Sequence, residues 1–158
     1  GTYPRLIEAD KSRIVAQACP ELAHAISNDA SGEAGAKLLD DYISEALAEF
    51  DTPPQAVFAF LGCTHYGYHS RLFKTMIEKR GIKTSILNPN DSLVNQLISG
   101  RHITTPNQSG VPDIKFISRY EVPPIEIASM EHYLKDTAPL TLAALKNQVV
   151  IPDLFDTL

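Results

Sequence analysis

The sequence predicts an α/β domain in which a mainly parallel sheet carries helices on both faces, in three layers. Short apolar runs with strand character alternate with helical stretches over residues 1–100, and no internal repeat or low-complexity tract interrupts them. Parallel strands joined by helices place the loops that follow the strands at one edge of the sheet. A chain of 158 residues, 44% of them hydrophobic, is long enough for one such domain with a real core.

The central strand is predicted at residues 56–61, a continuous apolar run that is typical of a strand buried on both faces. Pro53 and Pro54 form a turn before it, and Gly62 ends it. Upstream, the apolar stretch at residues 13–18 predicts another strand, which ends at Cys19. This places both cysteines of the chain at carboxyl ends of strands.

Two helices are predicted between these strands. Residues 21–28 have one apolar face at helical spacing, and turn residues follow them. Residues 33–50 give the clearest helix, because apolar side chains recur there at steps of three and four. The opposite face of that helix is acidic, which indicates contact with solvent rather than a functional site.

After the central strand, residues 70–80 predict a helix with Phe73 and Met76 in the core, and Gly81 ends it. Residues 83–87 predict a third strand, and Asn90 or Asp91 is expected to cap a helix that extends to Gly100.

The domain organisation follows from these elements. Residues 1–100 form the main α/β domain, residues 101–112 a linker loop, and residues 113–158 a tail that packs on the same sheet or on a separate first domain. Within the tail, residues 114–118 and 149–151 have strand character, whereas residues 124–134 and 140–147 have helical spacing.

Charge and cysteine content exclude several classes of protein. The net charge of −5, without a basic stripe, argues against a nucleic-acid partner. Two cysteines, no signal-like segment and no apolar run of membrane-spanning length indicate a reducing, cytoplasmic setting and no disulfide scaffold. No membrane partner is expected, whereas association into a homo-oligomer remains open.

Three reactive side chains, Cys63, Thr64 and His65, follow the central strand directly. Open α/β sheets bind ligands at this edge. The start of a helix and a neighbouring imidazole both stabilise a thiolate, which can act as a base, a nucleophile or a metal ligand. Thr64 and nearby backbone N–H groups suit a carboxylate or phosphate, and His65 suits proton transfer.

Other interpretations of this loop stay open. Cys63 could be a small buried residue at a strand end, as free cysteines often are. It could attack a carbonyl with His65 or His69 as the base. A zinc site at Cys63 and His65 lacks paired donors elsewhere in the sequence. A binding module for small anions without catalysis is a fourth possibility.

The stretch Leu61-Gly-Cys-Thr-His-Tyr66 resembles the second cysteine motif of the aspartate/glutamate racemase family, and most closely that of the glutamate racemases within it. Gly1-Thr2 is similar to the Gly-Thr opening of the second domain in that family, and Ala18-Cys-Pro20 is similar to its Ala-Cys-Pro strand end. The resemblance covers residues 1–98 and, weakly, residues 115–134. One departure is Gly67, where the family usually has proline.

The resemblance implies an isomerase that inverts the α-carbon of glutamate or aspartate, as in the supply of D-amino acids for the cell wall, without cofactor or metal. Two cysteines act from opposite faces of the substrate. Cys63 would be one of these acid/base residues and His65 its proton-transfer partner, whereas Thr64 would bind the substrate carboxylate and Thr2 would be a weaker contact.

The resemblance also implies that part of the enzyme is missing from this sequence. The other cysteine of the family lies in a first domain, in a Cys-Asn-Thr context that does not occur here. We therefore expect the chain to be the C-terminal portion of a longer racemase and to be inactive alone. Cys19 is not expected to replace the missing base, because the cysteine of the Ala-Cys-Pro motif is not a catalytic residue in the family.

Overall fold

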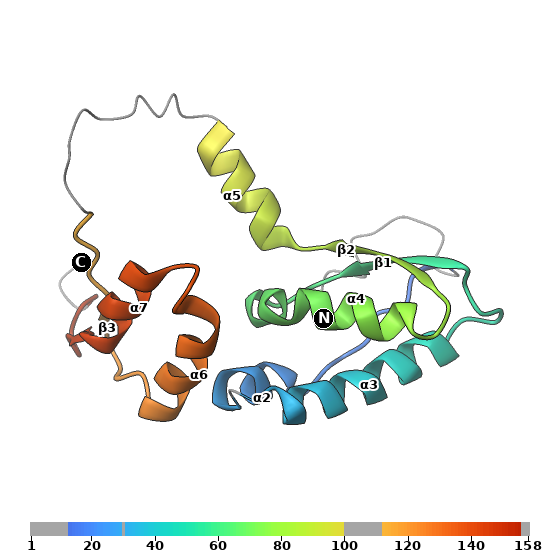
Figure 1. Cartoon of the computed structure of the whole chain (residues 1–158), viewed down its shortest axis with the longest axis horizontal. Coiled ribbons are helices and arrows are strands. Elements are labelled where there is room, and N and C mark those ends of the chain that lie inside the picture. The colour runs from blue at the N-terminus through green and yellow to red at the C-terminus, as the bar shows by residue number, and fades with distance from the viewer. Residues whose placement is uncertain (1–12, 30, 100–111, 156–158) are drawn as a thin grey trace.

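The computed structural model describes residues 13–29, 31–99 and 112–155. Within these ranges the chain is a mixed structure of helices and short parallel strands, as predicted (Figure 1). The elements in chain order are α2 (Leu22–Asn28), α3 (Glu33–Ala48), β1 (Ala56–Phe60), the 3₁₀-helix η2 (Thr64–His69), α4 (Ser70–Glu78), β2 (Lys83–Leu87), α5 (Pro89–Ser99), β3 (Ile117–Ser118), α6 (Pro124–Leu134), α7 (Pro139–Lys146) and β4 (Val149–Val150).

The strands form two separate parallel pairs. β1 pairs with β2, so that Ala56 lies opposite Lys83 and Phe60 opposite Leu87. β3 pairs with β4 in the same sense, although each has only two residues. Helices connect the strands in both pairs, which confirms the prediction of parallel strands joined by helices.

The main core lies between α2, α3, α4 and the inner face of the β1–β2 pair. Each of the three helices buries apolar side chains one turn apart, which is the spacing that gives a helix a single apolar face. The fully packed members are Leu22, Ile26, Leu39, Ile43, Leu61, Phe73, Ile77 and Ile82.

No described residues cover the opposite face of the β1–β2 pair, so the prediction that β1 is buried on both faces is wrong. Phe58 is 76% exposed and Phe60 is 59% exposed, whereas Val57 and Ala59 pack against the core. Successive side chains of a strand point to opposite faces, and the described residues cover only one of them. The described part of the chain thus shows two layers at these strands.

The strand predicted at residues 13–18 is also wrong. Residues 14–19 run without strand pairing, and Gln17 donates a 2.8 Å hydrogen bond to the carboxylate of Glu45 on α3. In the described structure β1 pairs with β2. An apolar run shows that a segment can enter a sheet, but it does not show whether a neighbouring strand is available.

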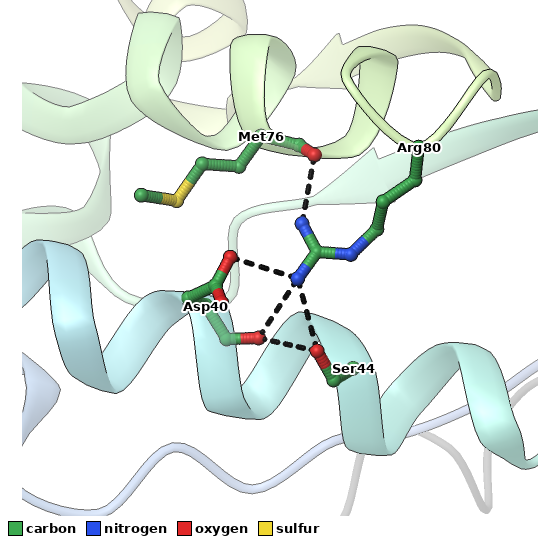
Figure 2. Close-up of polar contacts among 4 residues, drawn as sticks. All are labelled: Asp40, Ser44, Met76 and Arg80. Atoms are coloured by element: carbon green, nitrogen blue, oxygen red, sulfur yellow. Dashed lines mark hydrogen bonds and ion pairs between the residues drawn. The ribbon is translucent and has the colours of Figure 1, made fainter.

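The side chain of Arg80 links α3 to the end of α4 by hydrogen bonds (Figure 2). Its guanidinium donates to the carbonyl of Met76 at 2.8 Å, to Oδ1 of Asp40 at 2.8 Å and to Oγ of Ser44 at 2.9 Å. The Met76 carbonyl belongs to the last turn of α4, where carbonyls lack partners within the helix. One side chain therefore satisfies the end of α4 and holds it beside α3.

Among the C-terminal elements, α6 packs on α2. α6, which has the bounds predicted for it, lies against α2 and α7. Oγ of Ser129 on α6 donates a 2.9 Å hydrogen bond to the carbonyl of Ile26 on α2. Except for Pro112, the predicted linker loop at residues 101–112 lies outside the described residues.

Helix ends differ slightly from prediction. α3 stops at Ala48 rather than at residue 50, and α5 begins at Pro89, before the predicted capping residues. The carboxamide oxygen of Asn88 accepts a hydrogen bond from the backbone N–H of Asn90 at 3.2 Å, so Asn88 caps the N-terminus of α5. None of the helices in residues 13–29, 31–99 and 112–155 is long and apolar enough to cross a membrane.

Candidate functional site

Cys63 lies at the carboxyl end of β1. The N–H of Leu61 donates to the carbonyl of Leu87 at 3.0 Å, which extends the parallel pairing one residue beyond the strand. The side chain of Leu61 belongs to the main core and is only 2% exposed. Two residues later, Cys63 has an extended backbone and directly precedes η2. The strand and its hydrogen bonds thus fix the position of the thiol at the edge where ligands bind in parallel sheets.

The structure brings Cys63 and His65 together. Sγ of Cys63 lies 3.6 Å from Nδ1 of His65, within the range of a sulfur hydrogen bond, and both residues are partly exposed. A thiol and an imidazole at this separation can share one proton, and a ligand in solution can reach both. Thr64, between them, is exposed.

Tyr66 holds this loop against the rest of the domain. Its hydroxyl donates to the carbonyl of Cys19 at 3.2 Å, and its ring lies 5.9 Å from that of the buried Phe73. Burial, followed by the neighbouring Cys19 and Cys63, raises the pKa of Tyr66 to about 12. The hydroxyl therefore keeps its proton and remains a donor throughout the physiological range.

Two asparagines, Asn88 between β2 and α5 and Asn90 in the first turn of α5, support the loop from another side. Nδ2 of Asn90 donates to the carbonyl of Thr64 at 3.2 Å. A β-carbon at Gly67 would lie 3.3 Å from the carboxamide nitrogen of Asn88 and 3.4 Å from that of Asn90, so glycine lets both amides approach. Sequence reasoning missed these residues, although a turn directly after the next parallel strand shares the edge of the Cys63 loop.

The backbone carbonyl of Cys19 accepts the hydrogen bond from Tyr66 in the Cys63 loop, whereas the thiol of Cys19 points to the carbonyl of Gln17. Its Sγ donates to the carbonyl of Gln17 at 3.8 Å. Burial and the Glu45 carboxylate raise the pKa of Cys19, and hydrogen bonding with Tyr66 offsets this only in part. A thiol of this kind keeps its proton, so Cys19 is a poor base at neutral pH.

His69 belongs to the packing between η2 and α6. The residue is 6% exposed, its Nδ1 lies 3.4 Å from the hydroxyl of Tyr133, and its Nε2 faces Gly35 at the start of α3. Burial lowers the pKa of His69. Both ring nitrogens are turned to these neighbours, which does not suit the role of base for Cys63.

An open depression of about 490 Å³ lies beside this packing and is lined by residues that include Tyr68, Arg71 and Tyr133. Cys63 and His65 do not line it. We place the candidate chemistry at Cys63, because the depression is wide open to solvent and its lining holds no thiol.

The remaining predicted site residue, Thr2, and three further histidines of the chain are less informative. Thr2 and His102 lie outside the described residues. Nδ1 of His24 lies 3.1 Å from the carboxamide of Asn28, and His132 stands edge-on to Tyr133. In the part of the chain that the structure describes, no three His, Cys, Asp or Glu side chains gather closely enough to hold a metal ion.

Comparison with known proteins gives no match, whether with family models, with curated proteins or with solved structures.

Proposed function

We propose that Cys63 and His65 form one half of a proton-transfer site that inverts the α-carbon of glutamate or aspartate without a cofactor. The supporting observation is the 3.6 Å contact between Sγ and Nδ1 at the carboxyl end of a parallel strand, with both side chains partly exposed. The type of reaction, racemisation, is inferred from the resemblance of the surrounding motif to the aspartate/glutamate racemase family.

In this proposal the Cys63 thiolate takes the α-proton of the substrate, and the C–H electron pair remains on the α-carbon as a planar carbanion. The imidazole of His65 stabilises the thiolate before the transfer and the substrate's new charge after it. Thr64, with its exposed side chain, suits the α-carboxylate of the substrate. Holding the reacting atoms in this geometry lowers the entropic barrier.

Inversion also requires a proton donor on the opposite face of the carbanion. Cys19 is a poor candidate, because its thiol donates to the Gln17 carbonyl and the backbone of its loop is tied to Tyr66. We assign the second donor to a first domain outside this chain, as the resemblance implies. The isolated chain is then inactive in inversion. In the complete enzyme, helices cover both faces of the sheet, which gives three layers.

The test is made in the complete protein with each enantiomer of glutamate and aspartate in deuterated water. Inversion is followed by circular dichroism and α-proton exchange by nuclear magnetic resonance. The Cys63→Ser variant is expected to lose inversion by about 10²–10⁴-fold, the usual contribution of a positioned acid or base. Exchange at one enantiomer persists through the opposite cysteine.

The matched control is Cys19→Ser, which is expected to retain inversion. Interconversion of enantiomers by Cys63→Ser at the wild-type rate would refute the assignment. A stable acyl adduct on Cys63 would instead favour nucleophilic Cys–His chemistry, and binding of glutamate without exchange would favour a non-catalytic module.

A further inference from the structure

The start of α5 lies beside the loop that carries Cys63. In the parallel pair Phe60 lies opposite Leu87, so β1 and β2 end at the same level and the segments that follow them are neighbours. Asn90 stands in the first turn of α5 and is partly buried, whereas every other residue of the helix is exposed. Asn90 is therefore the residue of α5 to examine for an effect on the loop.

Asn90 makes one contact that concerns the reactive pair. Its Nδ2 donates a 3.2 Å hydrogen bond to the carbonyl oxygen of Thr64. That carbonyl belongs to the peptide unit that joins Thr64 to His65, and a peptide unit is planar and rigid. A donor that fixes the carbonyl oxygen therefore also fixes the direction in which the backbone enters His65.

The preceding peptide unit is fixed by the loop itself. The carbonyl of Cys63 accepts from the N–H of Tyr66 at 3.1 Å, which is the bond between residues three apart that opens a 3₁₀-helix. The carbonyl oxygens of both peptide units between Cys63 and His65 are thus bound, one by the backbone and one by Asn90. The 3.6 Å separation of Sγ and Nδ1 depends on both bonds.

η2 needs support from outside, and Asn90 is held in place to give it. The helix has six residues, whereas 3₁₀-helices longer than about three or four residues are uncommon because their hydrogen bonds have poor geometry. The backbone N–H of Asn90 donates to Oδ1 of Asn88, and Nδ2 of Asn88 donates to Oδ1 of Asp91. Gly67 leaves room, since a β-carbon there would lie 3.4 Å from Nδ2 of Asn90. The carboxamide is thus in position before any ligand binds.

We infer that Asn90 is a positioning residue that controls the reactivity of Cys63 through His65. Its carboxamide keeps the imidazole within reach of the thiol, so that the thiolate is stabilised in advance. Without the carboxamide, the peptide unit before His65 is free to turn and the imidazole moves away from Sγ. The part of Asn90 in inversion rests on the proposed function, whereas its effect on the thiol does not.

The test is a double-mutant cycle, followed by the rate at which iodoacetamide alkylates Cys63 near neutral pH. All variants carry Cys19→Ser, which leaves Cys63 as the only thiol of the chain. His65→Ala is expected to slow alkylation, because the thiolate loses the imidazole. Asn90→Ala is expected to slow it by about two- to tenfold, the factor that corresponds to one hydrogen bond. In the His65→Ala background, Asn90→Ala should have no further effect, because the two residues act as a unit.

The matched control is Asn95→Ala, the same substitution at an exposed site of α5, which should leave the rate unchanged. Alanine is a better helix former than asparagine, so both substitutions keep the helix. Equal slowing by Asn90→Ala with and without His65 would show an effect on the fold in general and would overturn the inference. An unchanged rate in Asn90→Ala would also overturn it.

The complete protein separates this inference from the proposed function. There Asn90→Ala is expected to lower kcat for inversion by up to about 10²-fold, the cost of misplacing a reacting group by about 1 Å, with KM little changed. If the cycle shows the coupling but the complete protein inverts neither glutamate nor aspartate, the proposed function fails and the positioning role stands. If inversion occurs and the cycle shows no coupling, the positioning role alone fails.

Discussion

Ser129 donates a 2.9 Å hydrogen bond from its Oγ to the carbonyl oxygen of Ile26, and both residues are buried. Ile26 lies in the last turn of α2, where a carbonyl has no N–H four residues further along the same helix. A serine far along the chain therefore satisfies the end of a short helix and joins α6 to the N-terminal elements.

Replacing Ser129 with alanine is expected to lower the free energy of unfolding by about 1–3 kcal/mol, because the Ile26 carbonyl then stays buried without a partner. Urea titration measures the change. Ser92→Ala, on the exposed α5, is the control and is expected to be neutral or slightly stabilising, since alanine is the better helix former. Equal effects of the two substitutions would contradict the role of this hydrogen bond.

Arg80→Lys is expected to lower the free energy of unfolding by about 1 kcal/mol. The side chain of Arg80 is 27% exposed and its guanidinium donates to α3 and to the end of α4 together, a fork that a single ammonium group cannot reproduce. Thermal or urea denaturation measures the loss. Arg71→Lys, in the first turn of α4, should change stability by less than about 0.5 kcal/mol, and a similar loss there would argue against the fork.

His69 is expected to make stability depend on pH. Because burial lowers its pKa in the folded state, the unfolded chain takes up a proton that the folded chain resists. Stability is therefore complete above the unfolded value of about 6.5 and is lost as the pH falls from there towards the folded pKa. Urea titrations at about pH 7.5 and about pH 5.5 span the start of this window.

The comparison variants for this prediction are His69→Gln and Tyr133→Phe. His69→Gln should show a smaller fall in stability between the two pH values, because it removes the titrating group. Tyr133→Phe should keep the fall, because the imidazole stays buried. An identical fall in wild type and His69→Gln would show that other groups cause it.

The thiol of Cys19 is expected to react slowly with alkylating reagents. In a Cys63→Ser chain, the midpoint of the alkylation rate against pH should lie higher in the folded than in the urea-unfolded protein, because burial and Glu45 raise the pKa of Cys19. Glu45→Gln should lower the midpoint, whereas Glu49→Gln should leave it in place. A folded midpoint at or below the unfolded one would contradict the environment described for this thiol.

Periodicity was enough to predict the long elements. α3 and α6 repeat their apolar residues at helical spacing, and the bounds predicted for α6 and β2 agree with the structure. Burial of β1 was not predictable in the same way. A run of apolar residues looks the same whether a second layer comes from the chain itself or from elsewhere, and Phe58 shows the difference.

The candidate site likewise has one contact that the sequence predicts and others that it does not. Cys63 and His65 are two residues apart, so a contact between them follows from local geometry. The contacts of Tyr66 with Cys19 and of Asn90 with Thr64 join residues 47 and 26 positions apart, and they depend on how the surrounding helices pack. No spacing rule for one segment predicts such contacts. The structure thus adds the supports of the loop rather than its reactive groups.

The arrangement of the strands in two parallel pairs affects how the protein unfolds in part. β1 and β2 are joined through α4, and β3 and β4 through α6 and α7, so each pair closes within its own stretch of chain. The packing of α6 on α2 connects the two sets. Amide hydrogens of one set should therefore exchange with solvent in partial unfolding events that leave the other set protected, as separate cooperative units.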